Sequence, residues 1–368
     1  MDKHDNKLNI AVFYTGQLRS YKKCIQYLKK NILLHDNVHI FATLELKQTG
    51  TETEMEIERE KHETVLKTHL SSHLKSLVWF NNNDETFINN RNKLIENCHI
   101  NYNNKNVYLD NLNSSFKDYL KNSGTITELF QYYISYNEMK QYEEKNNFNY
   151  DYIVRVRTDI ILCKEIDFSF LQLTDKDIEN RILKIKETLF PQDETIYENQ
   201  RINNKYISLI MNSLLDENRI YLQNVNCTSF INNLEFNNIF TFQDLNNYIK
   251  NGNYILTIRK NLFFLIKRNI FNSIHDLCLN YGTIHFETTD NLNMYFWDAE
   301  TQFEKYLQNK QINKFDSTHL FEDQSLYQYD KKKYFLEANE EEQEQEQEKK
   351  EILSPNINGI YLFICREY

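Results

Sequence analysis

A strand, a helix and a second strand follow one another near the start of this chain. The apolar run at 8–14 has the length of a buried strand, and another apolar run covers 38–43. Between them, apolar residues recur at helical spacing from Tyr21 to Ile32. Two strands joined by one helix over so short a stretch must run parallel, with a right-handed crossover. The unit therefore predicts an α/β fold built on a parallel sheet.

The same alternation continues through the first half of the chain. The predicted elements are a charged helix at 52–74, a strand at 77–80, an Asn-rich insertion at 81–113, a Tyr-rich helix at 126–142 and a strand at 149–163. Helices and strands that alternate in this way favour a doubly wound arrangement. We therefore expect a mostly parallel, twisted sheet flanked by helices.

The strand predicted at 149–163 carries charge on one face. Arg155, Arg157 and Asp159 are spaced two residues apart, so their side chains point to the same side of a strand. Burial of unpaired charge is unfavourable, so these groups must pair with each other, with a ligand or with a metal. Two interpretations follow. Either an ion pair from one arginine to Asp159 serves only the fold, or the carboxyl end of this strand opens on an anionic ligand, as in open α/β sheets.

Gly16 stands where the first predicted strand meets the first helix. A glycine there lets the backbone approach a ligand closely, and the N-terminus of the following helix favours phosphate. A plain turn glycine would give the same pattern. On this feature alone, both interpretations stay open.

The second half of the chain gives weaker patterns. Predicted elements are helices at 175–188, 207–215 and 270–279, a strand at 257–266, a helix at 297–307 and a last strand at 359–365. The acidic, low-complexity run at 340–351 is predicted to be a solvated loop. The last strand is expected to return to the core after that loop.

Composition excludes several classes of protein. The net charge of −10 argues against non-specific binding of nucleic acid, which requires a basic face. Six isolated cysteines contain no C-x-x-C pair, so neither a zinc ribbon nor a disulfide framework is indicated. The most apolar window, 254–271, is interrupted by four basic residues and is too charged to span a bilayer. The polar N-terminal residues enter a strand directly, so we expect a cytoplasmic protein without a signal peptide.

Four sequence features, taken in order, resemble a known family. They are Gly16-Gln17-Leu18-Arg19 after the first strand, a Tyr-rich helix containing Gln131, the strand YDYIVRVRTDI, and WDAE before a late helix. Together they resemble the nucleotide-sugar glycosyltransferases of GT-A fold, and most of all the bacterial and giant-virus branch whose strand reads Arg-x-Arg-x-Asp. The resemblance covers 8–43, 126–162 and 297–307. It implies a Rossmann-like sheet with a helical insertion and the acidic loop near the C-terminus, in the cytoplasm of the host if the protein is viral.

The resemblance also implies a donor site. In that fold an Asp-x-Asp motif ends a central strand and holds Mn²⁺ or Mg²⁺ against the diphosphate of the donor. Asp159 matches the second aspartate and is implied to be the metal ligand, whereas Arg157 stands at the first, which departs from the motif. A guanidinium there could neutralise the diphosphate directly by bidentate contact. The residues implied to bind the donor are Gly16, Gln17, Arg19, Arg155 and Arg157.

On the acceptor side, the resemblance implies a general base. In inverting members an Asp or Glu near the start of a late helix deprotonates the acceptor hydroxyl, and Asp298 and Glu300 match that place. Glu300 is the better candidate, because Asp298 can cap the helix. The alternative is that both carboxylates are there only because a helix N-terminus favours them.

These inferences predict one GT-A-like domain over 1–335. Its nucleotide-binding half covers about 1–165 and its acceptor half about 166–335, followed by the acidic loop at 336–352 and the C-terminal strand at 353–368. The predicted partners are a nucleoside-diphosphate sugar and a hydroxyl acceptor, with no nucleic acid and no integral membrane segment. The predicted activity is transfer of the sugar to that hydroxyl.

Two alternatives to this activity remain. The first is a non-catalytic relative, a binding or virion-associated protein that kept the fold, and the arginine at position 157 favours it. The second is a nucleotidyltransferase, which would need a Gly-rich or Lys-bearing loop to hold phosphate near the first strand. The chain offers only Gly16 and Arg19 there.

Overall fold

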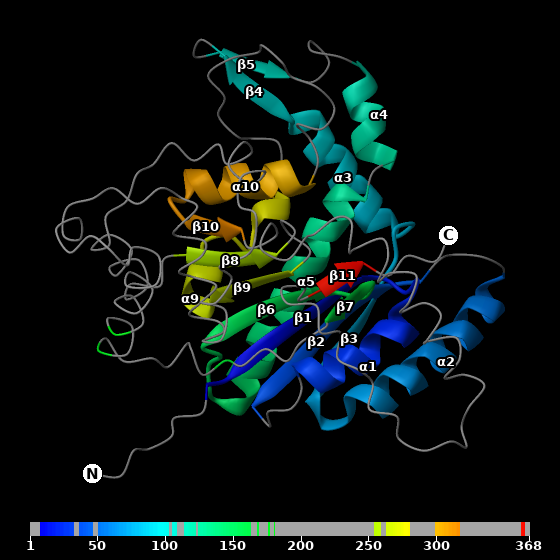
Figure 1. Ribbon diagram of the computed structural model, residues 1–368. Helices are drawn as coiled ribbons and strands as arrows, with labels where there is room; N and C mark the ends of the chain where they lie inside the picture. Colours follow the sequence, from blue (N-terminus) through cyan, green and yellow to red (C-terminus); the bar gives the residue numbers. More distant parts are fainter. Residues whose placement is uncertain are drawn as a thin grey trace, which may run out of the picture.

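The structure is a computed structural model, shown in Figure 1. It describes residues 8–32, 37–46, 51–102, 105–108, 114–122, 124–162, 254–258, 263–279, 299–316 and 362–364, together with residues 168, 176 and 180. All statements below refer to these residues. Apart from residues 176 and 180, the helix predicted at 175–188 lies outside them. So do the helix predicted at 207–215, the acidic loop, Trp297 and Asp298.

The described chain is organised on a seven-stranded sheet with the order β10–β8–β9–β6–β1–β2–β3. Neighbouring strands are parallel from β6 to β3 and between β8 and β10, whereas β9 is antiparallel to both of its neighbours. The predicted α/β class with a mostly parallel sheet is therefore confirmed. The strands are β1 (Ile10–Gln17), β2 (Val38–Glu45), β3 (Leu74–Phe80), β6 (Tyr152–Arg157), β8 (Tyr254–Ile258), β9 (Phe263–Lys267) and β10 (Asn313–Asp316).

Helices cover both faces of this sheet. Helix α1 (Tyr21–Asn31) and helix α2 (Glu52–Leu70) lie in front of it in Figure 1, and helix α5 (Thr125–Asn146) lies behind it. Strand β1 is buried on both faces because its side chains alternate between the two helical layers. The predicted crossover from β1 through α1 to β2 is confirmed, and both strands extend beyond their predicted ends.

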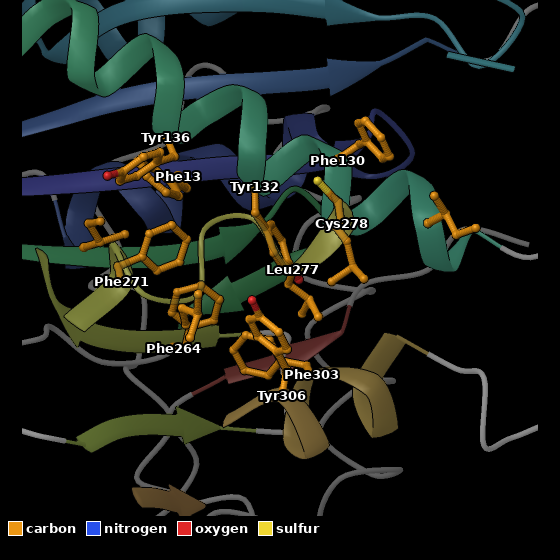
Figure 2. Packing of buried hydrophobic residues seen from close by; sticks show 14 of the residues in the cluster. Phe13, Phe130, Tyr132, Tyr136, Phe264, Phe271, Leu277, Cys278, Phe303 and Tyr306 are labelled. Carbon is orange, nitrogen blue, oxygen red and sulfur yellow. The ribbon is translucent and has the colours of Figure 1, made fainter. Parts of the chain in front are cut away.

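The core lies between α5 and the sheet. Figure 2 shows Phe13 of β1 packed with Tyr132 and Tyr136 of α5 and with Phe264 of β9. Aromatic side chains from the second half of the chain complete this layer. Phe13 meets Phe271 edge to face at 5.5 Å, and the Phe264 ring stacks on a residue of helix α10 (Ala299–Asn309), Phe303, at 5.6 Å. The two halves of the chain therefore share one core.

The insertion after β3 contains a hairpin as well as helices. Helix α3 (Glu85–Asn97) leads into β4 (His99–Tyr102) and β5 (Lys105–Tyr108), which pair antiparallel, and helix α4 (Ser114–Asn122) follows. This unit stands above one edge of the sheet in Figure 1. The prediction of a helical insertion is therefore correct for its helices and incomplete for its strands.

The charged strand predicted at 149–163 is two strands. Strand β6 ends at Arg157, a turn contains Thr158 and Asp159, and β7 (Ile160–Leu162) leaves the main sheet. Strand β7 pairs antiparallel with β11 (Leu362–Ile364), which confirms a strand within the predicted segment 359–365. The Thr158 N–H makes the last backbone bond of the β1–β6 ladder, and its hydroxyl bonds to the Gln17 oxygen of β1 where the chain turns.

Two other predictions near the end of the sheet are wrong. The segment at 257–266 holds parts of two antiparallel strands, β8 and β9, in place of one strand. The segment at 270–279 is a short helix, α9 (Arg268–Phe271), followed by turns and the 3-10 helix η7 (Leu277–Leu279). Side chains there bond to nearby carbonyls, with Ser273 Oγ donating to the Ile270 oxygen at 2.7 Å, and such bonds compete with a regular helix.

Helices in the described part of the chain are all too short or too polar to cross a membrane. The longest of them, α5 and α2, carry charged residues along their length.

Candidate functional site

A cavity of about 450 Å³ opens at the carboxyl ends of the parallel strands. Ligands of open α/β sheets bind at this edge. The cavity brings together seven of the eight residues that the sequence singled out, from three distant segments of the chain. These are Gly16, Gln17, Arg19, Arg155, Arg157, Asp159 and Glu300. The eighth, Asp298, lies outside the described residues.

Position 16 requires glycine for two reasons, its backbone conformation and the close approach of Thr158. Its φ of +128° is one that other residues rarely adopt, and a Cβ built there would lie 3.0 Å from Thr158 Oγ1. Thr158 also binds β1 directly, because its N–H donates to the Thr15 oxygen at 3.1 Å and its hydroxyl donates to the Gln17 oxygen at 2.5 Å. The close approach at Gly16 is therefore made by Thr158, which locks the end of β6 to the end of β1.

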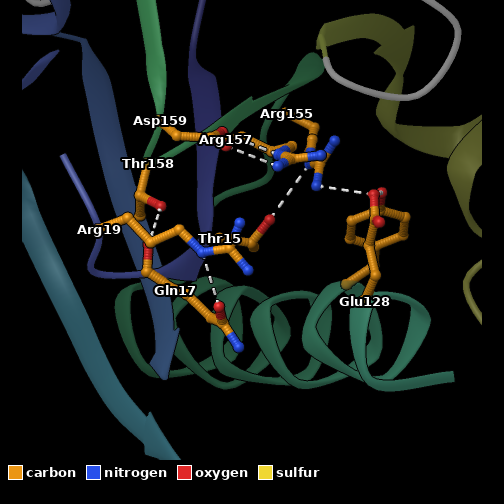
Figure 3. A network of polar contacts seen from close by, with 9 residues as sticks. Thr15, Gln17, Arg19, Glu128, Arg155, Arg157, Thr158 and Asp159 are labelled. Carbon is orange, nitrogen blue, oxygen red and sulfur yellow. Dashed lines mark hydrogen bonds and ion pairs between the residues drawn. The ribbon is translucent and has the colours of Figure 1, made fainter. Parts of the chain in front are cut away.

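Arg155 is part of the scaffold. Its side chain is only 1% exposed, and it lies level with Phe13 on one side and Phe264 on the other. The guanidinium donates to Thr15 Oγ1 at 3.1 Å and to Glu128 Oε1 of α5 at 2.9 Å, and its centre lies 4.8 Å from the Tyr132 ring. These contacts join β1, β6 and α5, as Figure 3 shows for the polar ones.

Arg157 makes a local ion pair with Asp159. Its Nε donates to Asp159 Oδ1 at 2.9 Å and its Nη2 donates to Oδ2 at 2.6 Å, so both carboxylate oxygens are engaged. Burial alone would lower the pKa of Arg157, but the carboxylates of Asp159 and Glu128 outweigh it and the pKa is raised. The Asp159 side chain is 3% exposed, whereas Arg157 is 20% exposed and lines the cavity. The ion pair predicted from the strand pattern is thus present (Figure 3), and both of its residues line the cavity.

Opposite this pair, the cavity has a polar wall that the sequence reasoning missed. Glu45 at the end of β2 accepts a hydrogen bond from Asn82 Nδ2, and the Thr127 hydroxyl donates to Asn82 Oδ1 at 2.9 Å. Burial raises the pKa of Glu45, against the hydrogen bonds from Gln17 and Asn82 and the charge of Arg19. Glu45 lies level with Gln17 in the parallel ladder. The predicted β2 ended two residues too early to place it there.

Two helices begin at the cavity. Helix α5 follows Gly124, which makes no side-chain cap, and both Gly124 and Thr125 line the cavity. Helix α10 begins with Ala299 and Glu300, which line it from another side. The partial positive charge of a helix N-terminus favours anions, so α5 adds to the arginines in making one part of the cavity suitable for phosphate. Arg19 stands exposed at this part, with its Nε donating to Gln17 Oε1 at 2.8 Å.

The side chains described around the cavity do not form a ligand set for a divalent cation. Within the described ranges, no three His, Cys, Asp or Glu side chains are grouped so that they could hold a metal ion. Asp159 is the carboxylate at the position that the motif would use, and both of its oxygens already accept from a guanidinium. Mn²⁺ and Mg²⁺ require several oxygen ligands. The cation implied by the resemblance stays a prediction.

No protein-family model matches the chain, and no curated protein matches it significantly. Any function therefore has to be argued from the site. Its chemistry is clear in outline: an exposed arginine, a half-buried arginine and an uncapped helix N-terminus face one cavity, with a carboxylate on a second helix across from them. Such a site can hold an anionic ligand beside a group that accepts a proton.

Proposed function

We propose that the protein is a GT-A-like glycosyltransferase that moves a sugar from a nucleoside-diphosphate donor to a hydroxyl acceptor. The observation that carries this proposal is the single cavity formed by residues 16–19, 155–159 and 300. These segments lie far apart in the sequence, and the resemblance implied that all three belong to one site. A mostly parallel sheet with the cavity at its carboxyl edge supports the same family of folds.

The donor diphosphate would bind between Arg19, Arg157 and the start of α5. Arg19 is exposed and Arg157 is half-buried, so both can reach a ligand, whereas Arg155 is enclosed by protein. Charge-assisted hydrogen bonds from guanidinium groups stabilise phosphate in the bound state and stabilise the extra negative charge on a departing diphosphate. Arg155 would support this site by fixing β6 against α5.

The acceptor would bind on the side of α10. As the acceptor oxygen forms its bond to the anomeric carbon, the bond from that carbon to the diphosphate breaks, and Glu300 would accept the hydroxyl proton. Glu300 lies in the first turn of α10 and lines the same cavity as Arg157. Donor and acceptor groups of the site therefore come from different halves of the chain.

One observation favours a second candidate, a non-catalytic binding protein. The cavity contains three guanidinium groups and four carboxylates, and the carboxylate at the motif position is occupied by Arg157. A binding protein would need the anion-binding part of the site but not the general base. Both candidates would bind the ligand, but only the glycosyltransferase would turn it over.

A thermal-shift screen with nucleoside diphosphates and nucleotide sugars, with and without Mn²⁺, tests ligand binding. A ligand present at one hundred times its dissociation constant should stabilise the protein by about 2.7 kcal/mol and raise its Tm. If no ligand of the panel raises the Tm of protein that is folded by circular dichroism, the donor site is wrong.

Hydrolysis of the donor without acceptor then tests turnover. In Glu300→Gln, transfer to an acceptor, once one is found, should fall ~100-fold or more while donor affinity is unchanged, because the base acts on the acceptor side. Glu304→Gln, one turn further along α10 and outside the cavity lining, is the matched control. Wild-type protein that binds a nucleotide sugar but never turns it over would support the binding protein instead.

A further inference from the structure

We infer that the counter-charge for the donor diphosphate is the guanidinium of Arg157, in the place where a divalent cation would otherwise be needed. This inference rests on the proposed function, because it concerns how the same site holds its donor. It starts from the disagreement between the residues at the end of β6 and the cation that the family resemblance implies.

The Asp159 carboxylate is already committed. Its two oxygens accept at 2.9 and 2.6 Å from the two arms of one guanidinium, which is the geometry of a strong bidentate pair. A cation bound to either oxygen would lie about 4 Å from the Arg157 charge, and two positive charges at that distance repel each other strongly in a half-buried site. Asp159 can therefore hold Arg157 or a metal, but not both in this arrangement.

The net charge of the strand end is the same in both designs. Two carboxylates and one divalent cation sum to zero, and so do the Asp159 carboxylate and the Arg157 guanidinium. The guanidinium has two features that suit the task. It is part of the chain, so no ion has to be recruited, and its flat fork of donors matches the oxygens of a phosphate.

Arg157 is also free to change partners, in a way that Arg155 is not. The Arg157 pair joins residues two apart in the chain, so its opening breaks no ion pair between distant elements. The Arg155 pair joins β6 to α5, and its guanidinium also contacts β1 and the Tyr132 ring. A ligand entering the cavity meets the 20% of the Arg157 side chain that is exposed.

This assignment gives Asp159 a positioning role. It holds the Arg157 fork through both of its oxygens and competes with the ligand for the same donors. The two designs predict different effects of Asp159→Asn on nucleotide affinity. If Asp159 bridges a metal to the diphosphate, Asp159→Asn must weaken nucleotide binding. If Arg157 is the counter-charge, removing the competing charge at Asp159 leaves nucleotide affinity unchanged or increases it.

The test is calorimetric titration of purified protein with uridine, guanosine, adenosine and cytidine diphosphates, in EDTA and again in Mn²⁺. We expect wild-type affinity to be the same in both buffers within about threefold. Arg157→Ala should weaken binding about 10-fold to 100-fold, the effect of losing charge-assisted hydrogen bonds. Asp159→Asn should bind at least as tightly as wild type in EDTA. Arg59→Ala, which removes a surface arginine from an ion pair on α2, is the matched control and should bind like wild type.

A converse variant sharpens the result. Arg157→Asp places two carboxylates at the strand end, so nucleotide binding should be lost in EDTA and recovered at least in part with Mn²⁺. If this variant does not fold, the wild-type, Arg157→Ala and Asp159→Asn titrations still decide the question.

The outcomes separate the inference from the proposal beneath it. Nucleotide binding by the wild type that requires Mn²⁺, or a loss of 10-fold or more in Asp159→Asn, overturns the inference and leaves the donor site intact. Binding by Arg157→Ala within threefold of wild type also overturns it. If no nucleoside diphosphate binds in either buffer, the proposed function itself fails and the inference with it.

Discussion

The two ends of the central strands carry charge in different ways. At the amino end, Glu143 of α5 accepts from Arg268 at 3.0 and 2.7 Å and from the Tyr150 N–H at 2.9 Å, and its side chain is 4% exposed. At the carboxyl end, both oxygens of Asp159 accept from Arg157, two residues away. One carboxylate ties together three segments of the fold, and the other closes a local turn beside a cavity.

The difference shows how sequence separation decides what an ion pair can do. The pair of Glu143 and Arg268 spans 125 positions, so its loss loosens α5 from the β9–α9 corner. The pair of Arg157 and Asp159 joins residues two apart, so its opening for a ligand breaks no ion pair between distant elements. Buried charge is tolerated at both ends because it is paired.

A matched pair of isosteric substitutions tests this comparison. Glu143→Gln should lower the free energy of unfolding by about 3 kcal/mol, because it leaves the Arg268 guanidinium without its counter-charge. Asp159→Asn should lower it by less, about 2 kcal/mol, because it breaks only the hydrogen bonds to Arg157 and leaves the contacts between distant segments in place. Urea denaturation of both variants measures the difference. Equal losses would show that the local pair is as structural as the distant one.

The carboxyl end is held instead by the contact of Gly16 with Thr158, and Gly16→Ala tests it. The substitution should lower the free energy of unfolding by about 2 kcal/mol, because φ is +128° and the new Cβ would lie 3.0 Å from Thr158 Oγ1. Adding Thr158→Ala separates the two causes, since it removes the contact and leaves the backbone strain. Gly16→Ala protein as stable as wild type would show that this end needs no glycine.

The smallest expected effect is a pH dependence at the amino end. His39 Nδ1 lies 2.6 Å from the Tyr150 hydroxyl, and burial, followed by the charges of Lys75 and His73, lowers the pKa of His39 from 6.5 to about 4. The unfolded chain therefore binds the proton more tightly than the folded one. Stability from this group is present above pH 6.5 and is lost as the pH falls toward 4.

The matched measurement compares wild type with His39→Gln in urea at pH 7, 5.5 and 4.5. The variant should lose less stability than wild type between pH 7 and pH 4.5, because position 39 no longer binds a proton. Parallel stability curves for the two proteins would contradict the assigned shift. The carboxyl end should not contribute to this difference, since His39 lies at the start of β2 and the cavity lies at its end.

The sequence predicted the first half of the fold well. The β1–α1–β2 unit, α2, β3 and α5 have apolar runs or apolar spacing of the right length, so local pattern and tertiary structure agree. The strand pattern placed Gly16 and Arg157 as site candidates and the family resemblance placed Glu300, and the cavity contains all three. The family resemblance itself stays a prediction.

The failures have physical reasons. The charged strand was predicted to be continuous because its alternation runs through Asp159, yet the chain turns where Thr158 bonds back to β1. Glu45 and Glu128 were missed because their roles depend on strand register and on which helix turn faces Arg155, and neither is written in local spacing. The segment at 270–279 has helical apolar spacing, but its polar side chains bond to the backbone and break the helix into turns.

The pairing of β7 with β11 has a consequence for how the protein is made. Ile160, the residue after Asp159, pairs with Ile364, so the strand next to the candidate site gains this partner only when residue 364 has left the ribosome. Strand β7 is also held from its other side early, because Asn31 Nδ2 of α1 donates to the Leu162 oxygen. Domains usually begin to fold from their N-terminal end during synthesis, and contacts distant in sequence form slowly. A nascent chain can therefore assemble β1, β2 and β6, and with them the groups assigned to the donor, before β7 gains its second partner.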